Sequence, residues 1–223
     1  MSIRIIGAGH IRECLPMAEC IRLMDQAMRA FSAARTVIPV RQVMPLEEER
    51  GYFFLMPGSM SDSPFYGAKI ASLQPANPEL GKPTVQGFVA LFERESGTPV
   101  ALLDGAAITA MRTAAASALA TRELARPDAR SHGIFGNGVL AAAHIEAIAC
   151  VRHIEEVRVW GRNNEHAIRL AGQQAERMGI RVIAVKDPAE AAACDIVSTV
   201  TNAPDPVLRG RWLRPGCHLN LVG

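Results

Sequence analysis

The sequence lacks the features that mark several classes of protein. Its 24 basic and 22 acidic residues leave a net charge of only +2, which favours neither a nucleic acid nor an anionic membrane as a partner. No apolar run approaches the length needed to span a bilayer. The N-terminus, MSIRIIGAGHIRECL, lacks the charged-then-apolar pattern of a signal peptide. We therefore predict a cytoplasmic protein with no membrane partner and no nucleic-acid partner.

Metal and disulfide signatures are also absent from the sequence. The five cysteines are scattered along the chain and form no C-x-x-C pair, which argues against a disulfide framework and a zinc site. His144 and His153 flank an apolar helical pattern without the spacing of H-E-x-x-H. Metal ligands normally occur in clusters, so a structural histidine is the better interpretation of each. The sequence predicts no metal site.

The first part of the chain combines a helix with several short strands. Residues 16–34 carry apolar residues at helical spacing and predict an amphipathic helix. Five apolar runs bounded by Gly, Pro, Ser or charged residues predict strands at 36–44, 51–57, 65–73, 84–93 and 98–104. The residues E-S-G-T between the last two runs indicate a hairpin turn. This pattern predicts an antiparallel or mixed sheet with one or two helices.

The pattern changes after residue 104. An alanine-rich helix is expected to begin at Asp104–Gly105 and to end before Pro127. Strands and helices then alternate, with strands expected at 132–136, 156–161, 181–185, 195–200 and 216–222. Such alternation is typical of a parallel sheet with right-handed crossovers. The predicted fold class is α/β: a Rossmann-type parallel sheet domain at 131–223, a connecting helix at 105–130 and an N-terminal α+β domain at 1–104.

A glycine turn lies where the first parallel strand meets its helix, in the stretch GIFGNGVLAAAHIEAI at residues 133–148. From Gly136 the pattern is G-x-G-x-x-A, and it follows a predicted strand and opens a predicted helix. Gly136 permits the tight turn, Gly138 lets the backbone approach a pyrophosphate, and the helix N-terminus favours an anion. The alternative is a glycine turn that binds nothing. We predict a cofactor site that includes Gly136, Asn137, Gly138, Val139 and Leu140.

The next strand ends in VRVWGRNNE, and this end bears on the choice of cofactor. NAD-binding sheets usually carry an acidic residue there, to hold the ribose 2′-hydroxyl. Here Gly161, Arg162 and Asn163 occupy that place, and a small residue followed by Arg suits a 2′-phosphate. The alternative for Arg162 is a solvated surface charge. We predict that NADP(H) is preferred and NAD(H) possible, and we include the range 199–201 (Thr199, Val200 and Thr201) in the cofactor site.

Three stretches together carry a resemblance to a known family. They are GAKIASLQPANPELGKPTVQGFVAL, GTPVALLDGAAITAMRTAAASALATRELARPDA and GIFGNGVLAAAHIEAI. The chain resembles the ornithine cyclodeaminase/μ-crystallin family, and the likeness runs from the N-terminal helix to the last residue. The resemblance implies a homodimer whose N-terminal domain binds substrate and pairs the subunits, with a Rossmann domain that holds NAD(P). It also implies hydride transfer at the α-carbon of an amino acid or its imine.

The resemblance assigns a substrate site and part of the cofactor site. The family's carboxylate-binding cluster matches Arg41, Lys69 and Arg112, with Lys69 as the catalytic residue. Charge-assisted donors suit a carboxylate that leaves water. Thr84 is assigned to substrate binding, while Arg112 and Thr113 are assigned to cofactor binding. Each cation has a simpler alternative: Arg41 as an edge charge, Lys69 as a lysine that extends its ammonium to solvent, and Arg112 as a surface charge.

The chain departs from the family pattern at three places. Phe54 stands in FLMP where cyclodeaminases carry the glutamate of E-L-M-P, and this favours a substrate with an apolar or smaller side chain. Leu140 replaces the usual glutamine of the glycine turn. The sequence stops at HLNLVG, where the family continues with an acidic residue, so we expect the C-terminal part of the family fold to be missing.

Three functions follow from the resemblance. The first is an NAD(P)H-dependent reductase of cyclic ketimine carboxylates, such as 1-pyrroline-2-carboxylate or 1-piperideine-2-carboxylate. The second is an ornithine cyclodeaminase, a lyase that releases ammonia and recycles NAD. The third is a non-catalytic, crystallin-like binding protein. Phe54 and the absence of an acid at the second strand favour the reductase.

Overall fold

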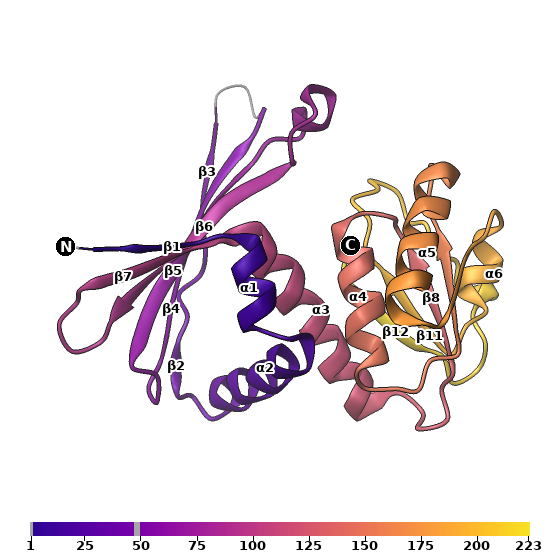
Figure 1. The fold of residues 1–223 in the computed structure, drawn as a ribbon, viewed down its shortest axis with the longest axis horizontal. Coiled ribbons are helices and arrows are strands. Elements are labelled where there is room, and N and C mark those ends of the chain that lie inside the picture. The colour runs from indigo at the N-terminus through magenta and orange to yellow at the C-terminus, as the bar shows by residue number, and fades with distance from the viewer. Residues whose placement is uncertain (1, 47–49) are drawn as a thin grey trace. The chain divides into compact units, whose positions relative to one another are not determined.

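The computed structural model describes residues 2–46 and 50–223, which form two β-sheets with associated helices (Figure 1). The chain divides into two compact units. The first contains residues 1–16 and 25–109, and the second contains residues 17–24 and 110–223. The domain limits at residues 104 and 130 stay a prediction. Within the described residues, no helix is both long enough and apolar enough to cross a membrane.

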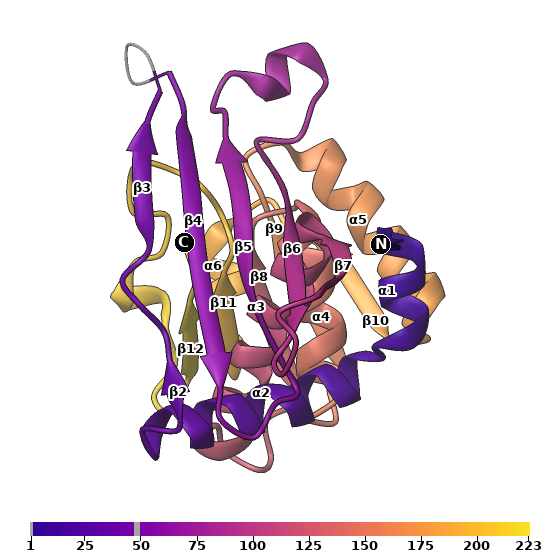
Figure 2. The same ribbon diagram turned by 90° about the vertical axis from the view of Figure 1, so that its left-hand side faces the viewer.

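The first unit is built on a seven-stranded mixed sheet, seen in Figure 2. Its strand order is β1-β7-β6-β5-β4-β2, with β3 also paired to β4. All neighbours are antiparallel except β1 and β7, which are parallel. The strands are β1 (Arg4–Ile6), β2 (Thr36–Val37), β3 (Gln42–Pro45), β4 (Tyr52–Met60), β5 (Phe65–Leu73), β6 (Val85–Glu93) and β7 (Pro99–Asp104).

Most of the predicted elements of this region are confirmed. The predicted helix at 16–34 is α2 (Met17–Ser32), and the predicted hairpin turn joins β6 to β7, with Gly97 at φ 67°. The predicted strand at 36–44 is wrong as a single element, because the chain leaves the sheet between β2 and β3. Pro39 lies in this gap, and a proline cannot donate a hydrogen bond to a sheet.

Two short elements at the N-terminus were not predicted. They are β1 and α1 (Ala8–Cys14). A 3₁₀ helix at Asn77–Leu80, between β5 and β6, was not predicted either. Elements of three to seven residues contain too few positions to show a period. β1 is specified by its partner instead, since Ile5 pairs with Leu102 of β7.

The second unit contains a five-stranded parallel sheet of order β10-β9-β8-β11-β12, as predicted for a Rossmann-type domain. Its strands are β8 (Ser131–Phe135), β9 (Glu156–Trp160), β10 (Arg181–Ala184), β11 (Ile196–Thr199) and β12 (His218–Leu221). Its helices are α3 (Gly105–Leu124, which begins in the first unit), α4 (Val139–Ala149), α5 (Asn164–Met178) and α6 (Pro188–Ala192), with a 3₁₀ helix at Gly210–Trp212.

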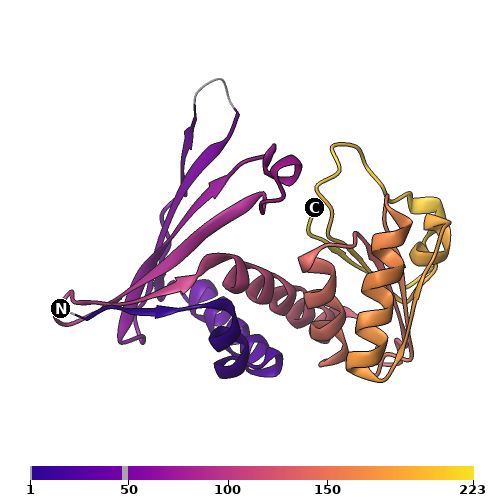
Figure 3. The same ribbon diagram turned by 45° about the horizontal axis from the view of Figure 1, so that its top comes forward.

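Helices cover both faces of this parallel sheet (Figures 1 and 3). α4 and α5 lie on one face and α6 on the other. Gly133 of β8 allows α6 to approach closely, because a Cβ at this position would lie 1.8 Å from the carbonyl oxygen of Ala191. The core between these layers is formed by residues such as Ile134, Ile145 and Val197, which are fully or almost fully buried.

Two histidines are buried in the second unit. The Nδ1 of His144 donates to the carbonyl oxygen of Leu140 (2.7 Å), so its Nε2 accepts from the hydroxyl of Ser117 (3.0 Å). His132 lies with its Nε2 2.9 Å from Ser198 Oγ. Burial lowers the pKa of both imidazoles. His144 is therefore a structural histidine, as the sequence predicted.

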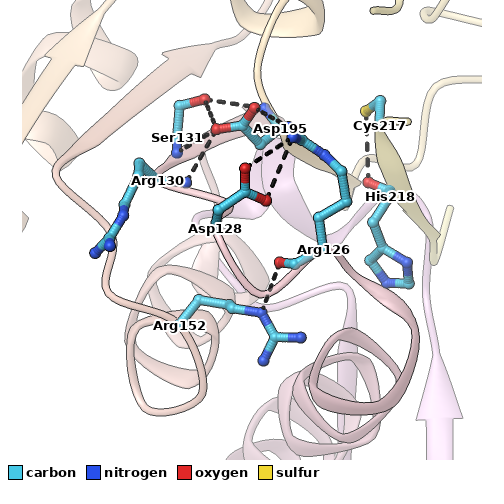
Figure 4. Close-up of polar contacts among 8 residues, drawn as sticks. All are labelled: Arg126, Asp128, Arg130, Ser131, Arg152, Asp195, Cys217 and His218. Atoms are coloured by element: carbon cyan, nitrogen blue, oxygen red, sulfur yellow. Dashed lines mark hydrogen bonds and ion pairs between the residues drawn. The ribbon is translucent and has the colours of Figure 1, made fainter. Parts of the chain in front are cut away.

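The amino edge of the parallel sheet is fixed by one carboxylate, that of Asp195 (Figure 4). Asp195 accepts hydrogen bonds from the backbone N–H groups of Arg130 and Ser131 (both 3.0 Å) and from the Ser131 hydroxyl (2.8 Å). The guanidinium of Arg126 donates to the same carboxylate at 2.7 Å. These donors outweigh the opposing effect of burial and lower the pKa of Asp195. The contacts join the start of β8 to the start of β11.

Arg152 caps the carboxyl end of α3. Its guanidinium donates to the carbonyl oxygens of Thr121 (2.9 Å), Arg122 (3.0 Å) and Ala125 (2.7 Å), and its Nε donates to that of Arg126 (3.1 Å). A helix leaves its last carbonyls without partners, and a cation there also favours the helix dipole. One side chain thus donates to two of the last carbonyls of α3 and to two carbonyls just beyond it.

Candidate functional site

The glycine turn lies at the carboxyl edge of the parallel sheet, directly after β8. β8 is central, and the chain continues to β9 on one side and returns to β11 on the other, which makes this edge a topological switch point. The backbone N–H of Gly136 donates to the carbonyl oxygen of Trp160 (2.8 Å), and that of Val200 donates to Phe135 (2.8 Å). These bonds bring the loops that follow β8, β9 and β11 to the same edge of the sheet, and these loops contain candidate cofactor residues.

Gly136 is required by the geometry of the turn. Its φ of 126° is strained for any residue with a side chain, and a Cβ would lie 2.7 Å from the carbonyl oxygen of Val200. Gly138 is different, because a Cβ there would meet no atom within 4 Å. Open space beside Gly138 is what the close approach of a pyrophosphate needs.

The N-terminus of α4 faces this open space. Its N-cap is Gly138, so no side chain caps the helix, and Val139 in the first turn is 68% exposed. The first N–H groups of a helix have no partners within it, and the dipole makes this end positive. An anion is the ligand that such an end favours. Leu140 lies in the same first turn, where the sequence placed it.

The loop after β9 carries Gly161, Arg162 and Asn163. Arg162 is exposed and forms no ion pair with any described residue. Asn163 is the N-cap of α5, and its side-chain oxygen accepts from the N–H of His166 (3.1 Å). The side-chain amide of Asn137 donates to the carbonyl oxygen of Asn163 (2.8 Å), which links this loop to the glycine turn.

The loop after β11 is the third loop at the carboxyl edge of the sheet. Thr199 and Val200 are buried, and Thr201 is partly buried with its hydroxyl accepting from the N–H of Ala203 (3.1 Å). The structure thus brings together every residue assigned to the cofactor from β8, β9 and β11.

Arg112 and Thr113 lie on α3, within the second unit. Arg112 is exposed but partly desolvated, which lowers the pKa of its guanidinium, and it forms no ion pair with a carboxylate among the described residues. The hydroxyl of Thr113 is buried and has no hydrogen-bond partner in the described chain. A cation without an internal anion and a hydroxyl without a partner are both suited to an external ligand.

Lys69 lies in the middle of β5, paired with Met56 of β4 and Val89 of β6. Its ammonium donates to the hydroxyl of Thr109 (2.5 Å), which in turn donates to the carbonyl oxygen of Gly105 (2.6 Å). Thr109 was missed by the sequence analysis, although ITAMRT places it three residues before Arg112 and hence on a neighbouring part of the same helix surface.

Arg41 lies just before β3, outside any strand, and its guanidinium sits over the ring of Phe54 at 5.7 Å from the centroid. Phe54 thus meets Arg41 through a cation–π contact. Phe54 and Met56 are two residues apart on β4, so their side chains lie on the same face of the sheet. Met56 pairs with Lys69, so Lys69 lies on this face as well, and Arg41 contacts it through Phe54.

Thr84 is not close to Lys69 along the sheet. It precedes β6, and its carbonyl oxygen accepts from the N–H of Gln74 (2.8 Å), five residues beyond Lys69. Five extended residues span roughly 17 Å. The roles of Thr84, Lys69 and the two arginines in binding a substrate stay predictions.

These features define a class of protein: an α/β protein with a Rossmann-type sheet and a dinucleotide-type glycine turn at its switch point. The family model described as the ornithine cyclodeaminase/mu-crystallin family matches residues 5–223. The chain belongs to this family.

Named relatives agree with this assignment. A Delta(1)-pyrroline-2-carboxylate reductase of Bacillus cereus is 38% identical over 220 residues, which cover 98% of this chain and 67% of the relative. Ketimine reductase mu-crystallin of Mus musculus is 36% identical over 185 residues, 83% of this chain and 58% of the relative. The solved structure of Thermococcus litoralis Delta(1)-pyrroline-2-carboxylate reductase in complex with NADH and L-proline matches with a TM-score of 0.93 and 33% identity, over 97% of this chain and 68% of that one.

Proposed function

We propose that this protein is an NAD(P)H-dependent reductase of cyclic ketimine carboxylates of the 1-pyrroline-2-carboxylate or 1-piperideine-2-carboxylate type. The observation that carries the proposal is the similarity, over almost the whole chain, to proteins named as Delta(1)-pyrroline-2-carboxylate reductases. The glycine turn at the switch point fits the dinucleotide that such a reaction requires.

The cofactor is proposed to bind at the carboxyl edge of the parallel sheet. Gly136, Asn137 and Gly138 would accommodate the pyrophosphate at the N-terminus of α4, and the unpartnered hydroxyl of Thr113 would bind a further oxygen. When bound, the reduced nicotinamide supplies the hydride that adds to the C=N carbon. The exposed guanidinium of Arg162 supports NADP(H) as the preferred form.

The substrate carboxylate is proposed to bind Arg41, Lys69 and Arg112. The two arginines have no carboxylate partner in the described chain, so a substrate anion would satisfy them. Binding at the carboxylate orients the adjacent imine carbon, and orientation of this kind contributes several kcal/mol to lowering a barrier. Lys69 is the proposed proton donor to the imine nitrogen, with Thr109 fixing the position of its ammonium.

A homodimer is proposed through the first unit. Five large apolar residues share the sheet face opposite Lys69 and are 37–84% exposed: Ile5, Met44, Phe53, Tyr66 and Phe88. An apolar patch of this kind marks an interface with another protein. Light scattering at micromolar concentration should give twice the mass of one chain, and replacing both Phe53 and Phe88 by Ser should give a monomer. A monomeric unmodified protein would contradict the dimer.

A substrate panel tests the reaction. The purified protein is supplied with NADPH or NADH and either 1-pyrroline-2-carboxylate or 1-piperideine-2-carboxylate, and the nicotinamide absorbance is followed. Loss of the reduced nicotinamide is expected with at least one imine. Ammonia released from ornithine without a net change in absorbance would instead indicate a cyclodeaminase, and cofactor binding without any turnover would indicate a binding protein.

A further inference from the structure

Asn137 occupies a position between two cofactor loops. It follows Gly136 in the turn after β8, yet its side chain crosses to the loop after β9, where its amide donates to the carbonyl oxygen of Asn163 at 2.8 Å. The same carbonyl accepts the N–H of Ala167 (3.2 Å), as the first bond of α5. Asn137 is thus attached to the residue that begins α5.

Gly161 provides the space for this amide. A Cβ on Gly161 would lie 2.4 Å from Nδ2 and 2.8 Å from Cγ of Asn137. Carbon and amide atoms do not approach so closely, so even an alanine would displace the Asn137 side chain from Asn163. The need for a small residue at position 161 therefore has a cause within the protein, in addition to the room that it leaves for a ligand.

Arg162 lies between the two contacts. On one side of it, Gly161 leaves the space that the Asn137 amide occupies, and on the other, Asn163 accepts the hydrogen bond from that amide. The backbone of Arg162 is held on the Asn163 side by the Asn137 hydrogen bond, although its own side chain is exposed and without an ion pair among the described residues. The guanidinium of an arginine forms two parallel hydrogen bonds to a phosphate only when the backbone that carries the side chain is correctly placed.

We infer that Asn137 is a positioning residue that sets the preference for a cofactor carrying a 2′-phosphate. Asn137, Gly161 and Asn163, here called the Asn137 brace, fix the loop of Arg162 against the phosphate-binding turn. The inference rests on the proposed function, because it requires a nicotinamide dinucleotide at this edge of the sheet. The backbone hydrogen bond from Gly136 to Trp160 holds the ends of β8 and β9 together. Trp160 is the residue before Gly161, so this bond does not reach the loop that contains Arg162.

The test is a double-mutant cycle read as a ratio of dissociation constants. NADPH and NADH are titrated against the fluorescence of Trp160, the last residue of β9, in four proteins: unmodified, Asn137→Ala, Gly161→Ala and the double variant. The preference for NADPH is expected to fall at least fivefold in each single variant. The double variant should be no worse than either single one, since both changes remove the same contact.

A matched control separates positioning from a general loss of stability. Asp187 caps α6 in the same unit, with its side chain accepting from the N–H of Ala189 (2.9 Å). Asp187→Ala should lower the melting temperature and leave the preference for NADPH unchanged. A change in preference equal to that of Asn137→Ala would overturn the inference.

Two further outcomes distinguish the inference from the proposed function. If the unmodified protein prefers NADPH and Asn137→Ala keeps that preference, the inference is wrong and the proposed cofactor site stands. If the unmodified protein binds neither dinucleotide, the proposed function is wrong and the inference falls with it. Additive losses in the double variant would also refute the brace, because they would show that Gly161 acts independently of Asn137.

Discussion

Mild acid is expected to destabilise the second unit through His132. This side chain is fully buried, its Nε2 contacts Ser198, and its Nδ1 has no partner among the described residues. Burial, helped by the nearby His144, lowers the pKa of His132 to about 3, from 6.5 in an exposed histidine. Between these two pH values the unfolded chain binds a proton that the folded chain does not, so stability is lost as the pH falls.

The magnitude follows from the two pKa values. Each pH unit below 6.5 costs about 1.4 kcal/mol, so the free energy of unfolding should drop by about 2 kcal/mol between pH 8 and pH 5 from His132 alone. The pKa of His144 is also lowered by burial, and this adds to the loss. The pKa of the Asp195 carboxyl is lowered as well, so its contribution is lost only at pH values below this window.

Urea unfolding followed by circular dichroism at pH 8, 7, 6 and 5 measures this dependence. His132→Gln removes the titrating group but keeps a polar side chain of similar size, so the variant should lose about 2 kcal/mol less than the unmodified protein over the same range. Equal pH slopes in the two proteins would falsify the assignment of the acid sensitivity to His132. Both proteins must unfold in a single transition at each pH for this comparison.

Three further changes test the proposed site and the fold. In a form of the protein shown to be active, Arg112→Ala should lower kcat/KM more than tenfold, equal to about 1.4 kcal/mol of transition-state binding. Arg112→Lys should also lower kcat/KM, because lysine lacks the planar guanidinium. Near-normal activity of both variants would refute the anion-binding role. Arg162→Ala should weaken NADPH binding, measured by fluorescence titration, far more than NADH binding, whereas tenfold tighter binding of NADH to the unmodified protein would contradict the predicted preference. Arg152→Ala should lower the free energy of unfolding by about 1–3 kcal/mol, since it leaves carbonyls at the end of α3 without donors; an unchanged urea midpoint would show that water replaces the guanidinium without cost.

Sequence patterns predicted the second unit more completely than the first. Parallel strands such as β8 and β11 are buried on both faces, and each alternates with a helix, so their apolar runs have clear limits. The first unit contains β1, α1, β2 and β3, which have two to seven residues each and depend on their partners. A period cannot be read from so few residues.

The candidate site was also predicted only in part from the sequence. The glycine turn was predictable because its glycine spacing after a strand is written in the sequence, and Gly136 meets a backbone requirement, a φ of 126°. The contact between Lys69 and Thr109 was not, since it joins residues 40 positions apart and depends on how α3 begins relative to β5. Gly161 was interpreted as space for a 2′-phosphate, and only the structure shows that the Asn137 amide occupies part of that space.

The close approach of α6 to Gly133 has a consequence for the variants that the gene can tolerate. Every missense change of a glycine codon introduces a side chain, and the smallest possible one would already overlap the carbonyl group of Ala191. To relieve the overlap, α6 would have to move away from β8 and expose neighbours such as Phe135 and Val197, which are now fully buried. Among the variants of a random library that still fold, position 133 should therefore carry only silent changes. This is expected although the position lies in a strand, where β-branched residues are normally favoured.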